Sequence, residues 1–166
     1  MAKKKRTPTP RQVFEQAIDK ANHLLLQNGL TAIKRSEGKG RIIADDPRRV
    51  LGSSNIDDDC RRAAPNASRW DYVIGYNRAG KTVAYFVEVH SAITSQVSKI
   101  EKKLNWLTHE FLGHENNAKL AALPKEIHWI ASGRVKIPKH TRQYRVLTTT
   151  LRKKGLQGPS EHLTLK

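Results

Sequence analysis

Apolar and polar residues alternate along this chain in patterns that match either a helix or a strand. In residues 11–28 and again in residues 94–112, apolar side chains recur every three or four positions, which predicts two helices that each bury one face. Gly29 is expected to end the first helix, because glycine readily adopts the left-handed conformation that commonly follows a helix. A third helix, rich in basic residues, is expected between Pro138 and Gly155.

Strand-like sequences surround a turn in the middle of the chain. RWDYVIGY and KTVAYFVEVHSA are rich in aromatic and β-branched residues, which are typical of strands, and NRAG between them is typical of a hairpin turn. Side chains alternate between the two faces of a strand. One face of the second strand is therefore expected to carry Val83, Tyr85, Val87 and Val89, and the other to carry Ala84, Phe86, Glu88 and His90.

The remaining elements are less regular. Residues 45–68 show no defined period and are expected to form a long surface segment in which acids and arginines are interleaved. The consecutive Asp57, Asp58 and Asp59 within it are expected to be solvated rather than to bind metal.

The order of elements predicts an α/β fold with a mixed central sheet of about four strands flanked by helices. Three further strands or hairpins are expected, at residues 31–46, 126–133 and 161–166.

Composition favours a single domain, residues 11–166, preceded by a flexible basic tail at residues 1–10. The chain has 31 Lys and Arg against 15 Asp and Glu, a formal charge of +16. Such a field attracts polyanions, most commonly nucleic acid; an acidic membrane surface, or charge that serves only solubility, is the alternative.

We expect no membrane partner, because no apolar run approaches the ~20 residues that span a bilayer. The absence of a signal peptide and the single Cys60 favour a cytoplasmic protein.

Two acids and a histidine stand where the hairpin strands meet. Glu88 and His90 share one face of the second strand, and hairpin pairing places Asp71 opposite the region of Val87 and Glu88. Two carboxylates near one point repel each other unless a cation lies between them, and carboxylates hold Mg²⁺ together with water and substrate phosphate. Such an ion activates water and stabilises charge on phosphate. The alternatives are a structural pair for Glu88 and His90 and a strand cap for Asp71.

The stretches RWDYVIGY and YFVEVHSA, with a helix before and a helix after, resemble the core of the PD-(D/E)XK nuclease superfamily. The pattern of that family is an acid at the start of one strand and acid–any–lysine on the next. Asp71 matches the first acid, Glu88 matches the second, and His90 stands in the position of the lysine. The resemblance covers residues 11–133. It implies a restriction-endonuclease-like core, Mg²⁺ or Mn²⁺ held by the two acids, and hydrolysis of phosphodiester bonds in DNA or RNA.

The resemblance also suggests roles for residues outside the strands. Glu15 matches a glutamate that many members carry in the first helix, and a solvent-facing glutamate is the alternative. Gln96 matches a glutamine that some members carry early in the following helix, and a plain surface residue is the alternative. Gln96 and Lys99 are expected to position the substrate. Basic residues of the tail, of the arginine-rich segment and of the C-terminal helix are expected to bind phosphates.

The sequence departs from the family pattern at two positions. Trp70 replaces a proline before the first acid, and with Arg69 it is expected to face nucleic acid. His90 replaces the lysine; a neutral imidazole can orient or deprotonate the attacking water, can bind Mn²⁺, or can mark lost catalysis. A metal-dependent nuclease is the leading hypothesis. A non-catalytic nucleic-acid-binding module on the same fold and a small basic toxin or partner-dependent effector are the alternatives.

Overall fold

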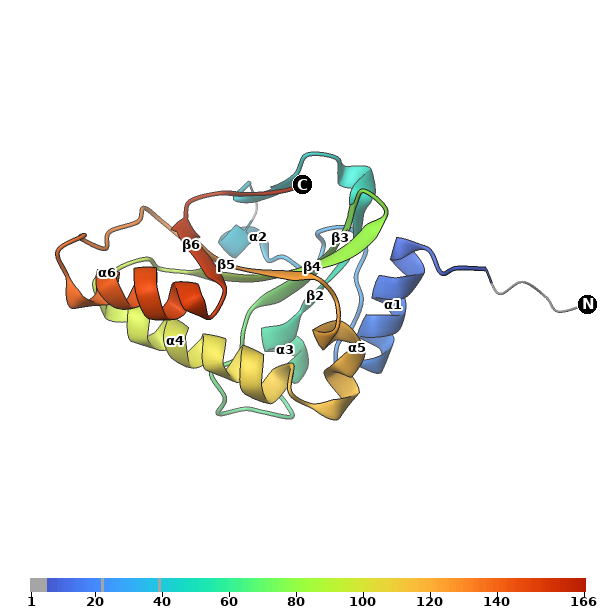
Figure 1. The fold of residues 1–166 in the computed structure, drawn as a ribbon, viewed down its shortest axis with the longest axis horizontal. Coiled ribbons are helices and arrows are strands. Elements are labelled where there is room, and N and C mark those ends of the chain that lie inside the picture. Colours follow the sequence, from blue (N-terminus) through green and yellow to red (C-terminus); the bar gives the residue numbers. More distant parts are fainter. Residues whose placement is uncertain (1–5, 22, 39) are drawn as a thin grey trace, which may run out of the picture.

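A five-stranded mixed sheet forms the centre of the molecule (Figure 1). The computed structural model describes residues 6–21, 23–38 and 40–166. The first three strands of the sheet are antiparallel, and the last two run parallel to their neighbours. The predicted α/β class and mixed sheet are thus confirmed, with five strands where about four were expected. In spatial order the strands are β2 (Val50–Asn55), β3 (Tyr72–Arg78), β4 (Lys81–His90), β5 (Lys125–Ala131) and β6 (Leu156–Ser160).

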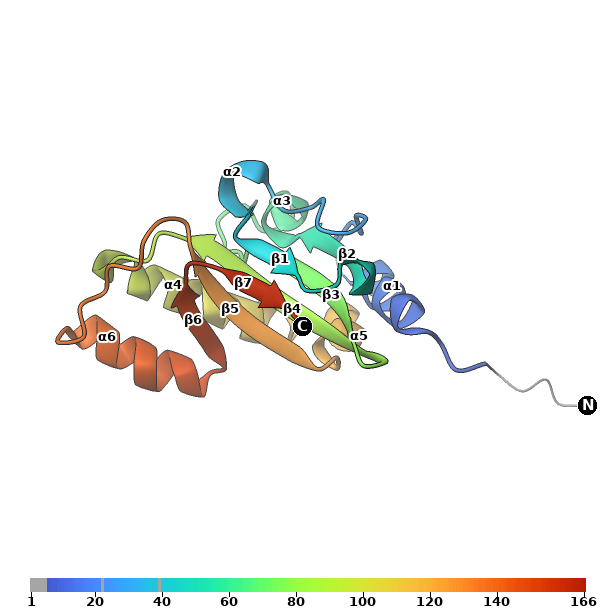
Figure 2. The same ribbon diagram turned by 90° about the horizontal axis from the view of Figure 1, so that it is seen from above.

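Helices cover one face of this sheet, and a small second sheet covers the other face (Figures 1 and 2). The second sheet pairs β1 (Ile42–Ala44) with β7 (Leu163–Leu165) in parallel. Three-residue 3-10 turns lie at Pro47–Arg49, Thr94–Gln96 and Glu115–Asn117. The α-helices are α1 (Pro10–Lys20), α2 (Arg35–Gly38), α3 (Ile56–Cys60), α4 (Val97–Asn105), α5 (Ala118–Ala121) and α6 (Arg142–Val146).

The β3–β4 hairpin confirms the alternation predicted from the sequence. Its turn is tighter than expected, because Arg78 already pairs with Lys81 and only Ala79 and Gly80 lie between them. Both turn residues have positive φ, 51° and 86°, as a two-residue type I′ turn requires. On β4, the Val83 face packs against the second sheet, and the Phe86 face packs against the helices.

The predicted helix at residues 94–112 is confirmed as one helical run. It starts with a 3-10 turn, continues as α4 and ends in a π-helical segment, Trp106–Phe111. The apolar seam predicted from its spacing is buried against the sheet, which places the opposite, polar side of α4 in solvent. That seam consists of Val97, Ile100, Leu104, Leu107 and Phe111.

The first helix is shorter than predicted, because it ends at Lys20 rather than near residue 28. The backbone of Gln27 instead exchanges two hydrogen bonds with Ser53 on β2, 2.8 and 3.0 Å long. Leu25, expected in the helical stripe, is 65% exposed. Tertiary pairing with a strand has therefore overridden a local helical pattern.

The segment expected to be a long surface loop contains the edge strand β2. Its signal was missed because it is built from Gly52 and small polar residues rather than from aromatic or β-branched ones. The buried hydroxyls of Ser53 and Ser54 are satisfied by backbone groups: Ala32 N–H donates to Ser53 Oγ, and Ser54 Oγ donates to Leu25 O. A polar strand can be buried where its neighbours supply such partners.

The two ends of the chain also differ from the prediction. Residues 1–5 of the expected tail lie outside the described residues, and Pro10 already belongs to α1, with Thr9 as its N-cap. The basic helix begins at Arg142, capped by Thr141, rather than near Pro138, and Gly155 follows it with φ 91° as expected. Strand β6 was not predicted, and the final strand joins the second sheet. Within residues 31–46 a short helix, α2, precedes the expected strand β1.

Candidate functional site

The hairpin register brings Asp71 and Glu88 together. Tyr72 pairs with Val87 in this antiparallel hairpin. Asp71, just before Tyr72, therefore lies beside Glu88, just after Val87. Asp71 N–H donates to Glu88 Oε2 at 3.1 Å, and Val89 N–H donates to Asp71 Oδ2 at 2.9 Å. Each carboxylate therefore has one oxygen fixed by a backbone N–H and its second oxygen free to meet another group.

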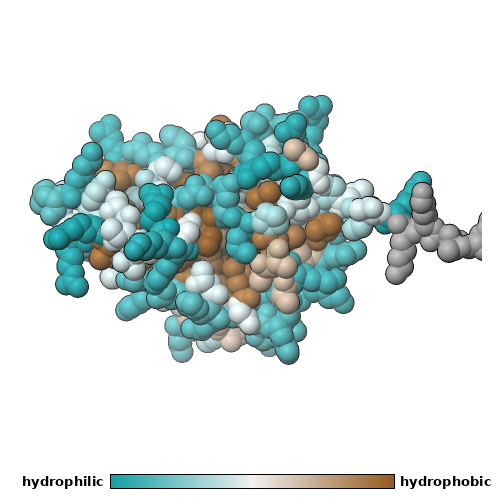
Figure 3. Space-filling view, in the orientation of Figure 1, coloured by the Kyte–Doolittle hydropathy of each residue, from teal (hydrophilic) through white to brown (hydrophobic). Residues whose placement is uncertain are grey.

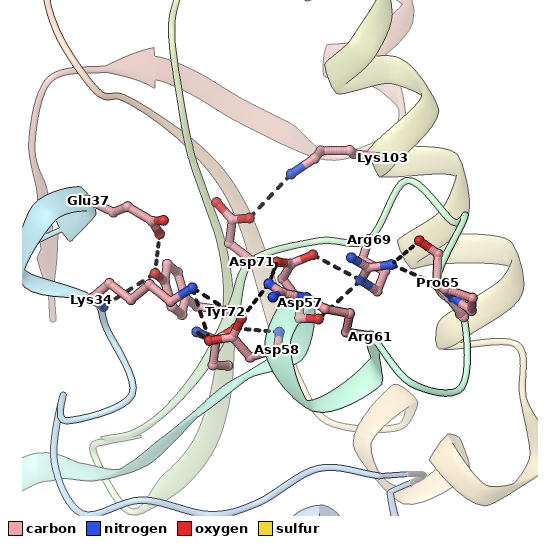
Figure 4. Close-up of polar contacts among 12 residues, drawn as sticks. Lys34, Glu37, Asp57, Asp58, Arg61, Pro65, Arg69, Asp71, Tyr72 and Lys103 are labelled. Carbon is pink, nitrogen blue, oxygen red and sulfur yellow. Dashed lines mark hydrogen bonds and ion pairs between the residues drawn. The ribbon is translucent and has the colours of Figure 1, made fainter.

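That other group is Lys103, which reaches the two carboxylates from α4. Figure 4 shows its contact with Asp71. Its Nζ lies 3.2 Å from Asp71 Oδ1 and also donates to Glu88 Oε1. The oxygens not held by backbone N–H groups thus converge on one ammonium. Three consecutive elements, β3, β4 and α4, supply the two acids and the base.

Burial makes this cluster electrostatically costly. Glu88 is fully buried, and the Asp71 side chain is 14% exposed. Removal from water raises the pKa of Glu88 well above its ordinary value, and the charge of Asp71 raises it further, against the lowering effect of Lys103. Burial likewise raises the pKa of Asp71, to which Glu37 on α2 adds a like charge. Burial alone would lower the pKa of Lys103, but the two carboxylates outweigh it and raise that pKa.

His90 lies at the edge of this cluster and does not bridge it. Its Nε2 is 2.8 Å from Gln96 Oε1, and its Nδ1 is 4.0 Å from Glu88 Oε1. An amide oxygen only accepts, so Nε2 donates and Nδ1 carries the lone pair of the neutral ring. Burial lowers the pKa of His90, as do the charges of Lys103 and Lys99, against an opposing effect of the Gln96 hydrogen bond. The imidazole is therefore neutral at pH 7.

The structure places the other predicted residues at different distances from the site. Gln96 contacts His90 directly, and Lys99 is exposed on α4 within electrostatic reach of that imidazole. Glu15 pairs with Arg11 at 2.7 Å on α1, and none of the described contacts joins it to the two carboxylates. Gln96 and Lys99 therefore lie beside His90 at the edge of the cluster, whereas no described contact connects Glu15 with it.

Trp70 and Arg69 do not form the nucleic-acid face expected of them. Trp70 is fully buried in the core beneath the helices, so its ring offers no surface for stacking. The Arg69 side chain is 11% exposed, and it donates to Asp57 and to the carbonyls of Ala64 and Pro65 (Figure 4). Both side chains point into the protein, so the structure does not place them on a surface that nucleic acid could contact.

The three consecutive aspartates have partners within the protein. Asp57 pairs with Arg61 and Arg69, and Asp58 pairs with Lys34 and Arg61 (Figure 4). Asp59 Oδ2 accepts from Leu25 N–H at 3.0 Å. These contacts fix α3 to the neighbouring loops, and they use the charges of the arginine-rich segment internally.

The prediction missed Lys103, which among the described residues is the base that contacts both acids. A signal was present: Gln96, Lys99 and Lys103 follow one another at spacings of three and four residues, which places them along one side of a helix. Gln96 and Lys99 were predicted to position the substrate, and Lys103 lies one turn beyond Lys99 on the same side of the helix.

The donor set suits a hard divalent cation. Within the described residues no group of three or more His, Cys, Asp or Glu side chains is arranged to hold a metal. Mg²⁺, however, commonly takes one or two carboxylates and completes its shell with water and substrate phosphate. Asp71 Oδ1 and Glu88 Oε1, which already converge on a cation in the form of Lys103 Nζ, provide that pair.

Comparisons with known proteins add no relative: no protein-family model, curated protein or solved structure matches this chain. In the part of the chain that the structure describes, no helix is long and apolar enough to cross a membrane.

Proposed function

We propose that the chain is a divalent-metal-dependent nuclease that hydrolyses phosphodiester bonds of DNA or RNA on a restriction-endonuclease-like core. The observation that carries the proposal is the convergence of Asp71, Glu88 and Lys103 at one buried point. The two acids stand where the family pattern places them. The positive charge that the pattern places on the second strand, where this chain has His90, comes instead from Lys103 on the following helix. The core order of that family is a helix, three strands, a helix and a strand. The order α1, β2, β3, β4, α4 and β5 is similar to it, with α2, β1, α3 and α5 inserted between these elements.

In this proposal Asp71 and Glu88 would hold Mg²⁺ or Mn²⁺. When bound, the ion supplies a Lewis acid for the phosphate and lowers the pKa of water. Lys103 then turns from the carboxylates toward the substrate, where its ammonium stabilises negative charge on a phosphate oxygen. Lys103 thereby takes the electrostatic role that the neutral His90 cannot fill.

His90 and its neighbours retain a positioning role in the same proposal. The lone pair of Nδ1 accepts a hydrogen bond or a proton from the attacking water, while Gln96 holds the ring through Nε2. Lys99, exposed one turn before Lys103, lies where it can meet a phosphate next to the one that is cleaved.

Cleavage of labelled single- and double-stranded DNA and RNA tests the proposal. Wild-type protein is expected to cut at least one of these substrates with Mg²⁺ or Mn²⁺ and none in EDTA. Asp71→Asn and Glu88→Gln are expected to abolish cutting, while Asp19→Asn, an exposed acid on α1, retains it. Cutting that persists in EDTA or in the Asp71→Asn protein would contradict the proposal.

A non-catalytic nucleic-acid-binding module is the second candidate, and one observation favours it. Lys103 already neutralises both carboxylates in part, so the cluster is a closed ion-pair network without metal. A protein that shifts DNA or RNA on a gel, and leaves all four substrates intact with either ion, would select this candidate.

A further inference from the structure

One stretch of the chain is basic without any compensating acid. From residue 127 to residue 160 the sequence contains no Asp or Glu. It includes the loop after β5, α6 and the π-helical segment Leu147–Leu151 that continues α6. Its basic residues are Arg134, Lys136, Lys139, Arg142, Arg145, Arg152, Lys153 and Lys154.

Most basic side chains of this stretch form no ion pair among the described residues, whereas Arg48, Arg61 and Arg69 each pair with an aspartate. Arg61 and Arg69 pair with aspartates of α3, and Arg48 pairs with Asp46 at 3.0 Å. Among the ion pairs of the described residues, the stretch contributes only Lys154, which lies 3.6 Å from Glu101. Of the two basic regions that the structure describes in full, this stretch therefore has fewer of its cations in ion pairs.

The helix arranges four of these cations on its solvent side. Leu147 and Leu151 are buried against the core and fix the opposite side. Arg142, Arg145, Arg152 and Lys153 are all exposed, and their spacing of three, seven and one residues follows one face of a helix. At about 1.5 Å per residue this row is roughly 17 Å long. We call these four residues the α6 basic face.

The α6 basic face lies next to the proposed site. Ala131, at the end of β5, pairs with His90, and Lys136 N–H donates to Ala92 O at 2.8 Å, so the basic stretch leaves the sheet at the edge that carries Glu88. Figure 1 shows α6 running beside α4, and Figure 3 shows a mainly hydrophilic outer margin at this end of the molecule. A groove of about 700 Å³ lies along α4, between Asn66 and Ser68 on one side and Lys102 and Lys154 on the other.

We propose that the α6 basic face binds the sugar-phosphate backbone of nucleic acid outside the bond that is cleaved. The inference rests on the proposed function for its choice of polyanion, because the face adjoins a site suited to phosphodiesters. A row of roughly 17 Å spans about five phosphates of one duplex strand at 3.4 Å each. The face therefore serves affinity and orientation, and the carboxylates serve cleavage.

Equilibrium binding without catalysis tests this inference. A variant with Arg142→Gln, Arg145→Gln, Arg152→Gln and Lys153→Gln is compared with a control that has Lys20→Gln, Lys81→Gln, Lys119→Gln and Lys125→Gln. The control positions are exposed and belong to α1, the first residue of β4, α5 and the first residue of β5. Both variants have the same net charge, and thermal unfolding verifies that both are folded. Binding of labelled duplex DNA and of RNA is measured in EDTA over a series of KCl concentrations.

The α6 variant is expected to lose about 3.6 from the slope of log K against log salt on duplex DNA, because each of four lost phosphate contacts removes about 0.9. The control is expected to lose less than about 1. Equal losses in both variants, or a wild-type slope in the α6 variant, would overturn the inference. So would unchanged nucleic-acid binding together with lost binding to vesicles of acidic phospholipid.

Cleavage by the same variants separates this inference from the proposed function. With Mg²⁺ the α6 variant is expected to raise KM and to keep kcat, because its four residues do not contact Asp71, Glu88 or Lys103. A selective loss of binding in a protein that never cuts would support the α6 basic face and refute the nuclease. Normal binding by an α6 variant that still cuts would refute the face alone.

Discussion

At the scale of single residues, Lys103 balances a charge that the fold would otherwise leave uncompensated. Asp71 and Glu88 are held next to each other by the register of the hairpin, and both are largely removed from water. Buried carboxylates that repel each other are costly, and such arrangements are concentrated at functional sites. Lys103 offsets part of that cost from the neighbouring helix.

Lys103→Met should therefore destabilise the protein. Removing one partner of a buried ion pair costs about 3 kcal/mol, so we expect a loss of that size in the free energy of unfolding at pH 8 in EDTA. The loss should shrink at pH 5, because the raised pKa values of Asp71 and Glu88 let them take up protons. Denaturant titration measures both values. Lys102→Met, an exposed neighbour, is the control, and equal losses in the two proteins would contradict the expectation.

Glu88→Gln should have the opposite effect on stability. The pKa of Glu88 is raised in the folded protein above its ordinary 4.5, so its contribution to stability is present at low pH and is lost as pH rises through the folded value. The glutamine variant lacks this loss. In EDTA we expect the two proteins to have similar free energies of unfolding near pH 4.5. At pH 8 we expect the free energy of unfolding of the variant to be larger than that of wild type by at least about 1 kcal/mol. A variant that becomes the weaker protein as pH rises would refute this assignment.

Two features of the site show what single residues reveal before a structure is known. The meeting of Asp71 and Glu88 was predictable, because a short turn fixes which residues of two strands lie opposite each other. The sequence places Lys103 on the same side of a helix as Gln96 and Lys99, but its contact with both acids was not predictable, because that contact depends on how α4 lies across the sheet. The burial of Trp70 likewise depends on packing from distant elements.

At the scale of elements, local patterns predicted the hairpin and the helix at residues 94–112 because each satisfies its own backbone and has a clear period. The end of α1 and the strand β2 depend on each other instead. Gln27 leaves the helical pattern to pair with Ser53, and Ser53 belongs to a strand with no apolar alternation. Neither element carries the signal alone, so both were mispredicted.

The contact between α1 and the sheet offers a test of the packing. A Cβ added at Gly75 on β3 would lie 2.5 Å from the ring of Phe14, which is fully buried. Overpacking of this kind costs roughly 1–3 kcal/mol, so Gly75→Ala should lower the melting temperature by several degrees. Gly133→Ala, where no atom lies within 4 Å, should leave it unchanged. If Gly75→Ala melts like wild type, or if adding Phe14→Leu recovers nothing, the packing of α1 is wrongly described.

At the scale of the whole molecule, two kinds of positive charge are separated in space. Lys103 is buried with its partners, whereas the α6 basic face is exposed on a different helix. The formal charge of +16 indicated a polyanion but not where it would bind, because net charge carries no positional information. Arg61 and Arg69 pair with Asp57 of α3, whereas the four residues of the α6 basic face have no acidic partner among the described ion pairs.

The anomalous scattering of Mn²⁺ in crystals of the protein tests whether Asp71 and Glu88 form a divalent-metal centre. We expect one peak bonded to Asp71 Oδ1 and Glu88 Oε1, with Lys103 Nζ moved away from these oxygens. Crystals of Asp71→Asn are expected to show no such peak. Wild-type crystals grown in the same Mn²⁺ concentration that show no peak there, with Lys103 still joining the two carboxylates, would contradict this expectation.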